Sequence, residues 1–89
     1  MVRSAELVFD ASEAMSRFGE SHTTVVLWQR FEVSHREMFD SLWSAIEFVR
    51  NTAFRPSRVE LHVHRGGHDV LIAGDELALL LAEHEEQKA

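Results

Sequence analysis

Two histidines and an aspartate flank a Gly-Gly pair, at positions His62, His64 and Asp69. If the glycines form a two-residue hairpin turn, His64 pairs with Asp69, and the three side chains share one face of the hairpin. Two imidazoles and one carboxylate are a ligand set for Zn²⁺ or a similar divalent ion. The cluster therefore predicts either a small metal-dependent or acid–base enzyme, or an ordinary solvated strand face.

Basic residues give the same surface a second interpretation. Arg58, His62 and His64 project together from the first strand of the hairpin, and Arg55 lies in the preceding turn. Guanidinium and imidazolium groups bind phosphates and carboxylates through charge-assisted hydrogen bonds. This pattern predicts a site for a small anion or for RNA.

Most other catalytic chemistry has no support in the sequence. The chain has no Cys and no Tyr, so neither a thiolate nor a phenol is available as a nucleophile. It also lacks a Gly-x-Ser-x-Gly elbow, a glycine-rich phosphate loop and a His-Glu-x-x-His motif. These absences favour a binding or assembly function over an enzyme.

Length and composition set the class of protein. The 89 residues are 45% hydrophobic and 27% charged, which predicts a single globular domain over residues 1–89. A net charge of −6 argues against general nucleic-acid binding, which requires a basic surface. The sequence shows no signal-peptide pattern and no apolar run near the ~20 residues that span a bilayer. We expect a cytoplasmic protein with no membrane segment.

Hydrophobic periodicity predicts the elements that position these side chains. They are a strand at Ala5–Phe9, a helix or loop at 11–18 after Asp10, a strand at Thr23–Val33, a helix opened by a Ser34–Glu37 capping box, a hairpin of strands at 58–64 and 70–72, and a last helix capped by Asp75. We therefore expect an α+β fold, with an antiparallel sheet of about four strands and two main helices packed on one face.

Apolar side chains are not confined to one side of these elements. The strand at Thr23–Val33 has two apolar faces, and Val26 and Trp28 stand on the second of them. In the helix after Ser34, Phe48 lies about 60° outside the apolar arc. In the last helix, Leu79 lies opposite the apolar stripe. That stripe is formed by Leu77, Leu80, Leu81 and His84, and His84 is interpreted as a helix-end residue near the negative pole of the helix dipole.

A small chain without disulfides gains buried area most simply by self-association. We therefore expect Phe48, Leu79, Trp28 and Val26 to contribute to a subunit interface. The leading hypothesis is a non-enzymatic binding module that acts as a homo-oligomer, with a dimer favoured, and that regulates a process through protein–protein contacts.

Overall fold

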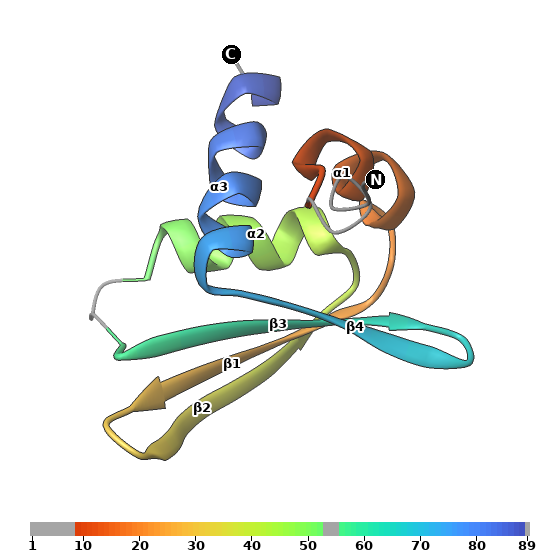
Figure 1. Ribbon diagram of the computed structural model, residues 1–89. Helices are drawn as coiled ribbons and strands as arrows, with labels where there is room; N and C mark the ends of the chain where they lie inside the picture. The colour runs from red at the N-terminus through yellow and green to blue at the C-terminus, as the bar shows by residue number, and fades with distance from the viewer. Residues whose placement is uncertain (1–8, 53–55, 89) are drawn as a thin grey trace, which may run out of the picture.

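The computed structural model describes residues 9–52 and 56–88 and shows an α+β fold. Its elements are α1 (Ala11–Phe18), β1 (Thr23–Gln29), β2 (Glu32–Phe39), α2 (Leu42–Arg50), β3 (Arg58–Arg65), β4 (His68–Ala73) and α3 (Gly74–Lys88). The strands form one antiparallel sheet in the order β2-β1-β3-β4. Figure 1 shows α1, α2 and α3 on the same side of this sheet. The predicted fold class is confirmed.

The strand predicted at Thr23–Val33 is too long. It ends at Gln29, and Arg30 and Phe31 form a tight turn into β2. Arg30 takes a left-handed φ of 61°, and Phe31 is 95% exposed. Hairpin turns of this kind are usually marked by Gly, Asn or Asp. An Arg-Phe turn inside a continuous apolar pattern carries no such mark, so the sequence pattern predicts one strand where the structure has two. Two apolar faces are typical either of a central strand or of one whose second face meets another subunit, and β1 is a central strand, between β2 and β3.

The capping box predicted at Ser34 and Glu37 is wrong, because both residues belong to β2. The helix begins several residues later. Its N-cap is Ser41, whose hydroxyl accepts a hydrogen bond from the Ser44 backbone N–H at 3.1 Å. An edge strand with nearly every residue exposed shows little apolar alternation, so the local Ser-x-x-Glu pattern outweighed the strand signal.

The segment after Asp10 is a helix, which resolves the choice between helix and loop at residues 11–18. The Asp10 carboxylate accepts a hydrogen bond from the Glu13 backbone N–H at 3.0 Å and caps the first turn. The strand predicted at Ala5–Phe9 lies, apart from Phe9, outside the described residues.

The β3–β4 hairpin agrees with its prediction. Its turn is Gly66-Gly67, with φ of 59° at Gly66, and His64 pairs with Asp69. At its other end β4 passes directly into α3. Gly74 is both the first residue of that helix and a left-handed residue, with φ of 62°, so no loop separates the two elements.

The core lies between the sheet and the three helices. Its buried apolar side chains are Ala14, Met15, Val25, Leu27, Leu42, Ala45, Ile46, Leu61, Val63, Ile72, Leu77 and Leu80. The strand members of this set alternate along β1, β3 and β4, so they point to the helix side of the sheet only. Within the described ranges, no helix is both long and apolar enough to span a membrane.

Ile46 and Met38 provide a test of where α2 begins. Both residues fit the predicted helical arc, but Ile46 is fully buried on α2 whereas Met38 is 63% exposed on β2. Ile46→Ala should lower the free energy of unfolding by ~2–5 kcal/mol, because it leaves a cavity in the core. Met38→Ala should change it by less than about 0.5 kcal/mol. Urea denaturation measures both, and similar losses for the two variants would contradict the strand assignment.

Candidate functional site

The face of the sheet turned away from the helices is uncovered in the described part of the chain (Figure 1). We call it the open face. It carries Thr24, Val26 and Trp28 of β1, Arg36 and Met38 of β2, Arg58, Glu60, His62 and His64 of β3, and Asp69 and Leu71 of β4. Most of the polar members line a shallow hollow at its centre. The predicted polar face of β3 is therefore part of a surface built by all four strands.

A chain of hydrogen bonds crosses three strands of the open face. The Asp69 carboxylate lies 3.0 Å from Nδ1 of His64, and Nε2 of His64 lies 2.7 Å from the hydroxyl of Thr24. The strand register explains this geometry, because Asp69 is the direct partner of His64 and Thr24 lies diagonally across from it. Thr24 was not predicted as a site residue, since its proximity depends on the pairing of β1 with β3.

The order of atoms resembles the acid–base–hydroxyl arrangement of nucleophilic hydrolases. Such enzymes also need free hydrogen-bond donors beside the nucleophile to stabilise an oxyanion. Thr24 lies within β1, where backbone N–H groups point into the ladders with β2 and β3. The hydrogen-bonded chain therefore orders the polar surface, and the described backbone N–H groups around Thr24 are directed into the sheet rather than towards an oxyanion.

Glu60 is the centre of a second polar cluster on the open face. Its carboxylate accepts a hydrogen bond from Arg58 at 2.6 Å and lies 3.1 Å from Nε2 of His62. The hydrogen bond from Arg58 is the largest influence and holds the pKa of Glu60 below its ordinary value; partial burial opposes this effect and His62 reinforces it. The buried indole N–H of Trp28 faces the same carboxylate and also lowers the pKa of Glu60, although it does not reach full hydrogen-bond geometry.

The predicted metal ligands do not converge. His64 and Asp69 contact each other, but His62 bonds to Glu60 instead, and both ring nitrogens of His64 are already engaged. Across residues 9–52 and 56–88, no group of three or more His, Asp or Glu side chains is arranged to hold a metal ion.

Three of the four predicted anion-binding residues are accompanied by a carboxylate. Arg58 and His62 contact Glu60, and His64 contacts Asp69. Arg55 lies outside the described residues. The open face thus carries alternating charges of both signs, which suits a surface of mixed polarity better than a phosphate site.

The predicted interface residues fall on different parts of the molecule. Val26 is buried and Trp28 half-buried on the open face, and Leu79 is 51% exposed on α3. Phe48 is half-buried beneath β2, with its ring 5.1 Å from Phe39 and 6.0 Å from His35. The expectation that a monomer leaves Phe48 exposed is wrong, because β2 supplies a covering that the predicted helix could not.

Besides Val33, which is 39% exposed and pairs with Trp28, two exposed apolar residues of the open face were not predicted as site residues. Met38 is 63% exposed and Leu71 is 50% exposed. Strand register places them in one row, Met38–Thr24–His62–Leu71, so that they mark the two edges of the sheet. The alternation of β4 could have identified Leu71, but Met38 required recognition of β2.

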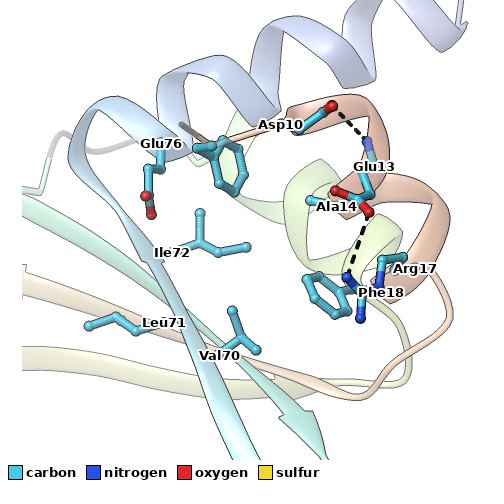
Figure 2. A pocket seen from close by; sticks show the side chains of 10 residues that line it. Asp10, Glu13, Ala14, Arg17, Phe18, Val70, Leu71, Ile72 and Glu76 are labelled. Atoms are coloured by element: carbon cyan, nitrogen blue, oxygen red, sulfur yellow. Dashed lines mark hydrogen bonds and ion pairs between the residues drawn. The ribbon is translucent and has the colours of Figure 1, made fainter. Parts of the chain in front are cut away.

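A separate cleft of about 340 Å³ lies between α1 and β4. Figure 2 shows Phe18 and Ile72 on its apolar wall, with Asp10, Glu13 and Glu76 around the rim. Two of these carboxylates already have local roles: Asp10 caps α1, and Glu13 pairs with Arg17 at 3.6 Å.

The chain was compared with protein-family models, with curated protein sequences and with solved structures, and none of the three comparisons gives a match.

The Glu60 cluster predicts a specific dependence of stability on pH. Since folding lowers the pKa of Glu60, its contribution is complete above the ordinary value of 4.5 and is lost as the pH falls through the lower folded value. Glu60→Gln should therefore lower the urea midpoint at about pH 7, and the difference from the wild type should shrink towards about pH 3. Glu20→Gln, an exposed site away from the sheet, is the control. An equal difference at both pH values would contradict this role.

Proposed function

We propose that the chain is a non-enzymatic binding module of the cytoplasm that works as a homodimer, with the open face as the contact surface between two copies. Its role would be regulatory, exerted through protein–protein contacts. Of the four interface residues predicted from the sequence, the proposal uses Val26 and Trp28 and leaves Phe48 and Leu79 outside the contact.

The observation that carries the proposal is the row that ends in Met38 and Leu71. A two-fold axis parallel to the strands, passing between two stacked sheets, lays β2 of one copy over β4 of the other. Met38 then meets the partner's Leu71, and this contact occurs twice. Apolar side chains that are exposed in one copy would thus be covered in the pair.

Charge supports the same arrangement. The next row of the sheet is Arg36–Val26–Glu60–Ala73. The same axis places Arg36 over the partner's Ala73, a small residue, and one strand spacing from the partner's Glu60. Arg36 is exposed and long enough to reach across that spacing. Because the two-fold axis repeats this pair, Arg36 of each copy would attract Glu60 of the other. The two attractions would also fix how the strands of one sheet are aligned over those of the other.

The area of the open face limits the size of the interface. Four strands about 4.8 Å apart, with roughly seven residues each rising about 3.4 Å, give roughly 450 Å² of flat area per copy. Two copies supply roughly 900 Å² before the relief of side chains is counted, and specific interfaces usually bury about 1,200–2,000 Å². We expect a dimer at the small end of this range, which dissociates on dilution.

Leu71 and Leu79 form a matched pair for testing the interface. They are 50% and 51% exposed, but Leu71 lies on the open face and Leu79 on α3. Leu71→Glu should convert the dimer to a monomer, because each dimer would cover the introduced charge twice. Leu79→Glu should leave the dimer intact. Sedimentation velocity over a concentration range of about a hundredfold measures both, with circular dichroism to confirm folding.

Two results would overturn this assignment. A wild-type protein that stays monomeric throughout the range would remove the homodimer. Dissociation by Leu79→Glu but not by Leu71→Glu would move the interface from the open face to α3.

A further inference from the structure

A histidine is enclosed where α2 and α3 meet. The side chain of His84 has no exposed area, and neither of its ring nitrogens has a hydrogen-bond partner in the described residues. Its ring packs against that of Trp43, with 4.3 Å between the ring centroids. Burying a neutral imidazole without hydrogen-bond partners already costs free energy of hydration, and burying a protonated imidazole costs far more.

Charged groups surround this histidine on both helices. On α2, a carboxylate oxygen of Glu47 lies 3.7 Å from Nε2 of His84, beyond hydrogen-bond distance, and accepts instead from the Trp43 indole at 3.2 Å. Arg50 of the same helix pairs with Glu85 of α3 and also donates to the Leu81 carbonyl at 3.3 Å. Lys88 is the remaining charged neighbour on α3.

The contact between His84 and Trp43 lies farther from the sheet than the buried residues of the first half of α3. It can therefore open while the rest of the core stays packed. The buried residues Leu77 and Leu80 hold the first half of α3 against the core, whereas residues 85–88 are all exposed. Figure 1 shows the C-terminal part of α3 extending away from the sheet. His84 is thus the last buried residue of α3, and beyond it Glu85 is joined to α2 by its exposed ion pair with Arg50.

We propose that His84 is a proton-operated latch, which holds the C-terminal turns of α3 on α2 while the imidazole is neutral and releases them when it is protonated. Release would increase the exposure of Trp43, which is half-buried, and would leave the sheet and the first half of α3 in place. The proposal concerns the helix side of the molecule and does not rest on dimerisation through the open face.

The direction of the pH effect follows from the protonation states. Burial is the main reason why the pKa of His84 falls below its ordinary value of 6.5; Arg50 and Lys88 lower it further, and Glu47 and Glu85 raise it. The unfolded or released state therefore binds a proton more readily than the closed state. The closed state is fully favoured above pH 6.5 and loses that advantage as the pH falls below it.

Tryptophan fluorescence can isolate the latch. The chain has two tryptophans, so Trp28→Phe leaves Trp43 as the only reporter. In that background the emission maximum should shift reversibly to longer wavelength as the pH is lowered from about 8 to about 5, while far-UV circular dichroism retains the signal of the sheet. Adding His84→Gln should abolish the shift. His22→Gln, at an exposed histidine, should leave it unchanged.

Several outcomes would overturn the latch. They are a shift that persists in the His84→Gln variant, Trp43 emission that does not change between about pH 8 and 5, and loss of the whole circular dichroism signal together with the shift. If His84→Gln fails to fold at neutral pH, His84→Leu replaces it. Leucine fills the site without a polar group, and it should also give emission that is independent of pH.

Discussion

A core on one face of a single sheet is the constraint on which the structure depends. Alternation along β1, β3 and β4 sends one set of side chains into the helices and the other set into the open face. The helices must therefore all pack on the same side, and the open face must satisfy its polar groups without them. The hydrogen bonds centred on His64 and on Glu60 do this from within the sheet. Those contacts leave the surface ordered and mixed in charge, with apolar residues at its edges.

Local signals predicted the parts of the fold where sequence and tertiary structure agree. The Gly66-Gly67 turn and the alternation of β3 each depend on a few neighbouring residues, and each was correct. The β1–β2 hairpin was missed because its turn uses Arg30 in a left-handed conformation that only tertiary context selects. The predicted capping box is wrong because the exposed strand β2 shows little apolar alternation around Ser34 and Glu37.

The same distinction explains what was predicted of the site. His64 and Asp69 were paired correctly because their hairpin is local in sequence. Thr24 was not identified as a site residue, since its contact with His64 depends on the pairing of β1 with β3, which are far apart in the chain. Glu60 contacts Arg58 and His62 on its own strand, so the alternation of β3 could have identified it. Met38 required recognition of β2 as a strand. His84 was placed on the correct stripe but interpreted as a helix end, whereas its burial follows from the approach of α2. Residues whose surroundings are built by distant segments cannot be interpreted from periodicity alone.

The direct passage from β4 into α3 at Gly74 also bears on how this chain can change over evolutionary time. A loop between two elements can accommodate an added or deleted residue, but no loop separates β4 from α3. One residue inserted between Ala73 and Gly74 turns every later position of the helix by about 100° relative to the sheet. Leu77, Leu80 and His84 would leave the core together. Length changes should therefore accumulate elsewhere on the surface, and residues 73–74 form a joint that tolerates substitution better than insertion or deletion.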